Sequence, residues 1–342
     1  MIESLETLYL LIFTHYPAQN RFALLLEMLE IGFYIVPQSA NFRASVFMLL
    51  AMGTFTIGDS ITKYLLIHMN SGQYMFIRGI FATIAIGLLA WRNGALRNLS
   101  MDKMTLLRVL GEVLATVTYI YSLGHLSQAF CSAVFQATPL VVTFGAVLFL
   151  NEKVGWRRWM CISFGLIGVL IIIRPGADTS TSIAAVGILL SSVCFAAMRD
   201  IATRRVPAHV PTLYLSTFTA GAIALTGGAL TIPMGGWQPV GIEPILFMVL
   251  AAALLLIGYH FIIMAMREGE ISFVSPFRYS SLLWAILLST VIFSEAPDSY
   301  TIVGSILVVG SGIYMVYREN ILKKRERNKS TLATTPTGVE PS

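Results

Sequence analysis

Long runs of apolar residues, separated by short polar segments, dominate the chain. The stretches 128–151, 179–198 and 244–266 contain no Asp, Glu, Lys or Arg. Each reaches the ~20 residues that a helix needs to cross ~30 Å of hydrocarbon. Lipid offers the backbone no hydrogen-bond partner, so a spanning segment must be a helix or a strand of a closed barrel. These runs lack the alternation of polar and apolar residues that barrel strands show, and they therefore predict helices.

Applied along the whole chain, the same criterion predicts an all-α integral membrane protein with ten transmembrane helices. The connections between them are short, and several contain Gly or Pro. The predicted helices cover residues 45–67, 73–91, 105–124, 128–150, 156–173, 182–200, 212–232, 244–266, 272–293 and 299–317.

Basic residues occur at every second connection. Clusters of Lys and Arg follow the second, fourth, sixth and tenth predicted helices, and Arg267 follows the eighth. Arg174 is the one basic residue in the intervening loops. Because Lys and Arg accumulate on the cytoplasmic side of membrane proteins, this alternation predicts that both termini are cytoplasmic.

An internal repeat accompanies this pattern. Similar residues recur about 140 positions apart near corresponding helix ends, which indicates two units of five helices. Because five is odd, the second unit would be inverted relative to the first, an architecture of secondary transporters that hold substrate near the membrane midplane. The pairs are Asp59 and Asp200, Glu152 and Glu295, and Tyr74 and Tyr214.

These observations divide the chain into four parts. Residues 42–178 form the first predicted repeat and residues 179–320 the second. Residues 1–41 carry scattered glutamates among apolar residues, and they predict either an interfacial amphipathic helix or an over-long start. Residues 321–342 are basic and then rich in Thr, Pro and Ser, which predicts a disordered cytoplasmic tail.

Composition supports the membrane interpretation and narrows the function. The chain is 56% hydrophobic and 12% charged, whereas a soluble domain is about 25% charged. The net charge of +5 lies in alternate loops, so it does not indicate nucleic-acid binding. The three cysteines form no CxxC pair, and no motif for a metal, a cofactor or catalysis is present. We therefore expect no enzyme, no metal site and no cofactor.

Ionisable residues at membrane depth are the candidates for function, because burying charge in lipid is costly. Asp59 and Lys63 are four residues apart in one predicted helix, which favours a structural ion pair over a ligand site. Asp59 is also a candidate for proton coupling. Arg78 lies about one and a half turns into the second helix. It would either pair with Asp59 or contact an anionic group of a substrate.

Glu112 lies near the middle of the third predicted helix. It is a candidate proton carrier, since burial of a carboxyl group favours its protonated form. The alternative is a structural role as the partner of Arg278 or Arg78.

Arg278 lies in a polar, aromatic segment of the ninth predicted helix. Pro276 removes a backbone donor there and can open the helix. Arg278, Tyr279 and Trp284 could bind a flat or anionic molecule by stacking and bidentate hydrogen bonds. A purely structural arginine is the competing interpretation. Gln136 in the fourth helix would form the opposite wall of the site.

The segments Phe76-Ile77-Arg78 and the two glutamates Glu152 and Glu295 resemble the EamA-type transporters of the drug/metabolite transporter superfamily. The resemblance covers about residues 45–317. Segments 59–64, 276–279 and 293–298 are similar to the branch that contains S-adenosylmethionine uptake and riboflavin carriers.

This resemblance implies a multi-pass carrier of the bacterial inner membrane that takes up a nucleoside-like or vitamin-like compound. Export of amino acids or related metabolites is the alternative, and an intramembrane enzyme is disfavoured. The expected partners are the small-molecule substrate and the lipid bilayer, and not nucleic acid. A homodimer is compatible with this class.

Overall fold

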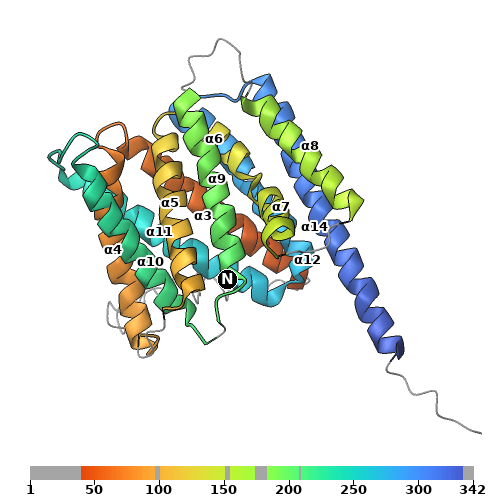
Figure 1. Ribbon diagram of the computed structural model, residues 1–342. Helices are drawn as coiled ribbons and strands as arrows, with labels where there is room; N and C mark the ends of the chain where they lie inside the picture. Colours follow the sequence, from red (N-terminus) through yellow and green to blue (C-terminus); the bar gives the residue numbers. More distant parts are fainter. Residues whose placement is uncertain (1–39, 97–100, 151–154, 174–182, 208, 334–342) are drawn as a thin grey trace, which may run out of the picture.

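The computed structural model describes residues 40–96, 101–150, 155–173, 183–207 and 209–333. Glu152 lies outside these residues, and so does the predicted interfacial segment 1–41 except for its last two residues. Throughout the described part, every regular element is helical (Figure 1). The elements are α3 (Ala40–Leu65), α4 (Ser71–Arg92), α5 (Lys103–Leu123), α6 (Gln128–Phe135), α7 (Thr138–Leu150), α8 (Trp156–Ile173), α9 (Ile183–Thr203), α10 (Thr212–Thr231), α11 (Ile242–Glu268), α12 (Ile271–Val274), the 3-10 helix η1 (Ser275–Tyr279), α13 (Ser280–Phe293) and α14 (Ser299–Ala333).

Within the described residues, nine helical segments are long and apolar enough to cross a membrane. The prediction of an integral membrane protein is therefore confirmed. The predicted fifth helix is present as α8, but its apolar part, Trp159–Ile173, is shorter than the other nine segments. Arg157 and Arg158 at its start reduce the apolar length.

Two predicted continuous helices are interrupted. The predicted helix 128–150 divides into α6 and α7 at Gln136, where Pro139 cannot donate to the carbonyl of Phe135. The hydroxyl of Thr138 donates to that carbonyl instead, at 2.6 Å. The predicted helix 272–293 divides at η1, which contains Pro276. The expected opening of the backbone at Pro276 is thus present.

Four helix pairs form the most extensive packing in the bundle: α4 with α10, α3 with α11, α5 with α9, and α8 with α14. In each pair, residue numbers rise along one helix as they fall along the other, so the two helices are antiparallel. The contacts that show this are Gly72 with Gly227 and Gly87 with Thr217; Arg43 with Glu268 and Phe55 with Gly258; Gly111 with Arg199 and Ser122 with Ala185; and Gly165 with Ser311 and Ile172 with Gly304.

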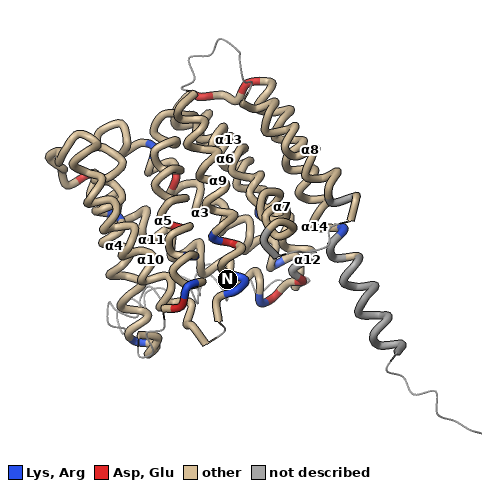
Figure 2. The backbone as a smooth tube through the Cα atoms, in the orientation of Figure 1, with Lys and Arg blue, Asp and Glu red and all other residues tan. Residues whose placement is uncertain are grey.

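Charged residues are sparse along the described part of the bundle, and several of the Lys and Arg coloured in Figure 2 lie towards one end of it. Large apolar side chains such as Leu88, Leu225 and Val291 are exposed on the outer faces. An outer surface with many exposed apolar side chains would be unfavourable in water, but it suits contact with lipid tails.

Glycines allow α4 and α10 to approach closely. A Cβ atom at Gly227 would lie 2.6 Å from the backbone nitrogen of Phe76, and one at Gly72 would lie 2.6 Å from that of Thr231. These neighbours are backbone atoms, which cannot turn away as a side chain can. Small residues at such positions are how membrane helices gain close packing.

We predict that Gly227→Ala lowers the melting temperature of the purified protein in detergent, because overpacking a helix interface costs about 1–3 kcal/mol. Gly187→Ala in α9 is the matched control, since nothing lies within 4 Å of its added methyl group. Alanine is the better helix former, so the control should melt at the same or a higher temperature. Equal melting temperatures for the two variants would contradict this account of the interface.

Candidate functional site

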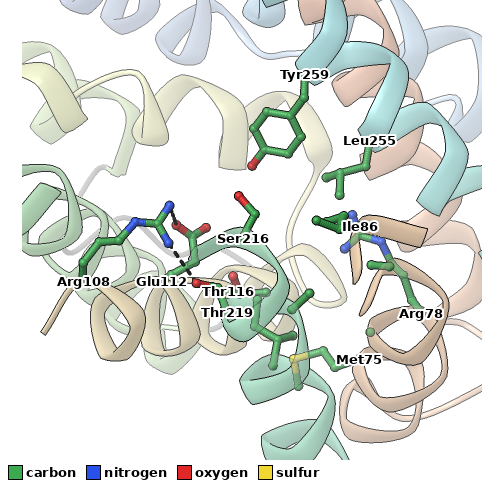
Figure 3. A pocket seen from close by; sticks show the side chains of 14 residues that line it. Met75, Arg78, Ile86, Arg108, Glu112, Thr116, Ser216, Thr219, Leu255 and Tyr259 are labelled. Carbon is green, nitrogen blue, oxygen red and sulfur yellow. Dashed lines mark hydrogen bonds and ion pairs between the residues drawn. The ribbon is translucent and has the colours of Figure 1, made fainter. Parts of the chain in front are cut away.

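A cavity of about 160 Å³ with both apolar and polar lining lies between α4, α5, α10 and α11. It contains charged and hydroxyl side chains at a depth where the surrounding helices are apolar. Figure 3 shows Arg108 and Glu112 on one side, Arg78 on the other, and Ser216 and Tyr259 between them. The lining residues are Met75, Arg78, Gly79, Ala82, Ile86, Arg108, Glu112, Thr116, Ser216, Thr219, Ala220, Ile223, Leu255 and Tyr259.

The start of α5 sets the register of the two charged residues that it contributes. Asp102 caps the helix by accepting from the backbone nitrogens of Thr105 at 3.0 Å and Met104 at 3.3 Å. The hydroxyl of Thr105 also donates to Asp102. These hydrogen bonds, led by that hydroxyl, lower the pKa of Asp102 below its ordinary value. The register places Arg108 and Glu112 one turn apart on the cavity face.

Glu112 is held by two arginines. Arg199 of α9 donates to both of its carboxylate oxygens, at 3.2 and 3.3 Å. Arg108 lies 3.9 Å away in the same helix and donates to the hydroxyl of Thr219 at 2.9 Å. The expectation that Glu112 pairs with Arg278 or Arg78 is therefore wrong. Arg108 was not among the predicted site residues, although its spacing of four residues from Glu112 predicts the contact.

Arg78 has a different environment. Its guanidinium lies over the ring of Tyr74, 5.9 Å from the centroid, which is a cation–π contact. It forms no ion pair with the described part of the chain, and its Nε atom is buried without an acceptor there. The Nε atom of Arg108 is also buried without an acceptor. Thus two guanidinium groups that line one cavity keep unused donors.

Asp59 and Lys63 do not form the ion pair that their spacing predicts. Asp59 accepts a hydrogen bond from the hydroxyl of Tyr119 at 3.1 Å. Lys63 pairs with Glu295, donates to the carbonyl of Leu126 at 3.1 Å, and lies over an aromatic ring of α13. Spacing alone was misleading because Glu295, distant in sequence, follows α13, and α13 packs against the helix α3 that carries Lys63.

A buried amide, which was not among the predicted site residues, joins α3 to α6. Gln128 is 1% exposed. Its Nε2 atom donates to the carbonyl of Thr56 at 2.9 Å, and its Oε1 atom accepts from Ser60 at 2.9 Å. The sequence feature that could have identified Gln128 is its position as a polar residue at the start of the apolar stretch 128–151.

The residues predicted around Pro276 form a cluster apart from the cavity. Gln136 donates to Ser281 at 2.7 Å and to the carbonyl of Tyr279 at 3.4 Å. Trp284 donates to the carbonyl of Leu49 at 3.2 Å. Arg278 is exposed and makes no hydrogen bond or ion pair with the residues that the structure describes. None of these four predicted residues lines the cavity that contains Arg78.

An all-helical membrane bundle with a charged cavity between its helices is the framework of a solute carrier. The profile of the EamA-like transporter family matches residues 42–174 and 182–318. The chain therefore belongs to the EamA-like transporter family, and the predicted resemblance is confirmed.

Relatives of known name are transporters as well. The S-adenosylmethionine uptake transporter of Rickettsia prowazekii (strain Madrid E) is 26% identical over 275 residues, which cover 79% of this chain and 91% of the relative. The pseudopaline exporter CntI of Pseudomonas aeruginosa (strain UCBPP-PA14) is 26% identical over 267 residues, covering 76% and 91%. The riboflavin transporter of Vibrio cholerae (serotype O1, strain El Tor Inaba N16961) is 25% identical over 294 residues, covering 84% and 97%. This chain is thus a membrane transporter and not an enzyme.

A solved crystal structure supports the fold. It superposes with a TM-score of 0.52, at 18% identity, over 82% of this chain and 98% of its own length. At this identity the likeness concerns the fold alone.

We predict that Glu295→Ala lowers the melting temperature, because it leaves the ammonium of Lys63, a residue that is 8% exposed, without its carboxylate partner. An unsatisfied buried polar group costs roughly 1–3 kcal/mol. The double variant Lys63→Met, Glu295→Ala should be less destabilised than Glu295→Ala alone. Additive effects in this double-mutant cycle would show that the two side chains do not interact.

Proposed function

We propose that this protein is a secondary transporter that takes up a small organic metabolite across the bacterial inner membrane by alternating access. The observation that carries the proposal is the charged cavity between α4, α5, α10 and α11. Arginine and glutamate are costly at such depth, and they are a mark of a substrate or ion pathway.

We infer that the protein is built from two inverted repeats of five helices, residues 42–178 and 179–320. The family profile matches twice, over 42–174 and 182–318. An exchange of the repeats would replace α3 by α9, α4 by α10, α5 by α11 and α8 by α14. This exchange converts the pair α3 with α11 into the pair α9 with α5, and it leaves the other two extensive pairs unchanged. The antiparallel direction of each pair also agrees with inversion.

Both termini would lie in the cytoplasm. Ten crossings bring the chain back to the side from which it started, and several of the basic residues coloured in Figure 2 lie towards that end of the bundle. Reporters fused before Ala40 and after Ala333 should both report the cytoplasm. At either position, a fluorophore that works in the cytoplasm should be bright, and a phosphatase that works only after export should be inactive. Reporter signals from opposite sides of the membrane would refute the ten-helix topology.

The names of the relatives support two substrate classes. Relatives named for S-adenosylmethionine uptake and for riboflavin transport favour import of a nucleoside-like or vitamin-like compound. The relative named as a pseudopaline exporter favours the alternative, export of an amino-acid-derived metabolite. Where η1 interrupts the helix, one wall of the transport path would be formed by Arg278, Tyr279 and Trp284, and Gln136 would form the facing wall.

We predict that proteoliposomes or cells containing the protein accumulate one of three labelled compounds: S-adenosylmethionine, riboflavin or an aromatic amino acid. Arg278→Ala should reduce that uptake at least about tenfold, the effect of losing ~1.4 kcal/mol or more of binding, with normal insertion into the membrane. Efflux from loaded vesicles would support export instead. Unchanged uptake by the variant would remove Arg278 from the path.

The same assay can test proton coupling through Asp59 or Glu112. A residue that carries the proton should, when changed to its amide, lose accumulation driven by a pH gradient but keep substrate exchange at equilibrium. Asp59 has a neutral donor, Tyr119, whereas Glu112 contacts two cations. Asp59 can therefore change protonation without breaking an ion pair, and we expect Asp59→Asn to show this separation.

A further inference from the structure

We propose that Arg78 is the anion-binding residue of the cavity and that it selects substrates bearing a carboxylate group. This inference rests on the proposed transport function and specifies its substrate class. It begins from the charges that line the cavity, which are two arginines and one glutamate. The lining therefore has one more positive than negative group.

The excess positive charge belongs to Arg78. Glu112 is already bound by Arg199 at 3.2 Å, and Arg108 is engaged by Glu112 and by the hydroxyl of Thr219. Arg78 is the lining cation without an ion pair in the described part of the chain, and its buried Nε atom has no acceptor there. A guanidinium has five N–H donors in a planar fork that matches a carboxylate.

Asp59 is a possible competitor for Arg78, because the two groups interact electrostatically. They form no ion pair in the described part of the chain, and the carboxylate of Asp59 takes its hydrogen bond from Tyr119 at 3.1 Å. The ring of Tyr74 holds the guanidinium of Arg78 in place without neutralising it. Arg78 is thus positioned, and its charge remains available to a ligand.

The size of the cavity limits what it can hold. Its volume of about 160 Å³ is well below the ~300–1,000 Å³ of sites that enclose a drug-sized ligand. A charged headgroup fits this space, and the rest of a metabolite requires the helices to move apart. The hydroxyls of Ser216 and Tyr259 lie between Arg78 and Glu112 (Figure 3), where they can accept from an amino group beside the carboxylate. This arrangement favours an amino-acid headgroup over a neutral ring system.

The test compares ligands that differ only in the carboxylate. Purified wild-type protein is titrated with S-adenosylmethionine and with its decarboxylated analogue, and the Kd values are measured by thermal shift or by isothermal titration. Wild-type protein should bind the carboxylate form about 10- to 100-fold more tightly, as expected for a charge-assisted bidentate contact. Arg78→Gln should abolish this ratio, and Arg78→Lys should retain part of it.

Arg92→Gln is the matched control, because Arg92 is an exposed arginine at the end of the same helix. It should keep the wild-type ratio. If Arg78 were only a structural counterion of Asp59, Arg78→Gln would lower the melting temperature of the ligand-free protein, and adding Asp59→Asn would restore it. Neither substitution would then alter the ratio of the two Kd values.

Equal affinity of the wild type for the two compounds would overturn the inference, as would a ratio that survives in Arg78→Gln. Binding and transport of riboflavin by the wild type, with no carboxylate-bearing compound bound, would overturn it as well but leave the transport function standing. If neither S-adenosylmethionine nor an amino acid binds and no compound is transported, both the inference and the proposed function fail.

Discussion

The absence of hydrogen-bonding partners in the lipid interior is the constraint on which this structure depends. A polar group at depth that finds no partner within the protein is costly, so most such groups are paired and an unpaired one among the described residues, such as Nε of Arg78, stands out. Thr138 supplies the donor that Pro139 lacks, and Gln128 satisfies both Thr56 and Ser60. Glycines at the interface of α4 and α10 contribute in another way, since close backbone packing replaces the hydrophobic effect that is missing between helices in lipid.

The same constraint determines where the charges lie. Lys63 with Glu295, Arg43 with Glu268, and Arg199 with Glu112 each join a residue before 178 to one after 179. These three ion pairs thus connect the two halves of the sequence. An ion pair in a low-dielectric setting is stronger than in water, and its separation leaves two costly charges. Relative movement of the halves must therefore exchange these partners or hydrate them.

Sequence patterns predicted the membrane class and the family because both depend on local features. Charge-free runs of about 20 residues, and motifs such as Phe76-Ile77-Arg78, can be recognised without knowledge of tertiary contacts.

The partners of the charged residues could not be predicted in this way. Lys63 has Asp59 at the favourable spacing of four residues, yet its carboxylate partner is Glu295 of the other half. Conversely, the local contact of Arg108 with Glu112 was available from spacing and was missed. The break at Pro276 was predicted from its polar, proline-containing segment, and Pro139 carries a similar local signal within the predicted helix 128–150. The separation of the Arg278 cluster from the Arg78 cavity required the folded chain.

Exposure distinguishes the ion pairs that can separate easily from those that cannot. The side chain of Glu295, which lies just after the end of α13, is 40% exposed, whereas that of Lys63 is 10% exposed. Glu112 and Arg199 are 21% and 24% exposed, and both are more enclosed than Glu295. Since hydration reduces the cost of separating charges, the Lys63–Glu295 contact is the better candidate to open and close during transport. The Glu112–Arg199 contact is then better suited to hold the cavity wall together while Arg78 faces the substrate. A carboxylate bound to Arg78 would neutralise the last unpaired charge of the cavity, and this would favour closure of the apolar helices around it.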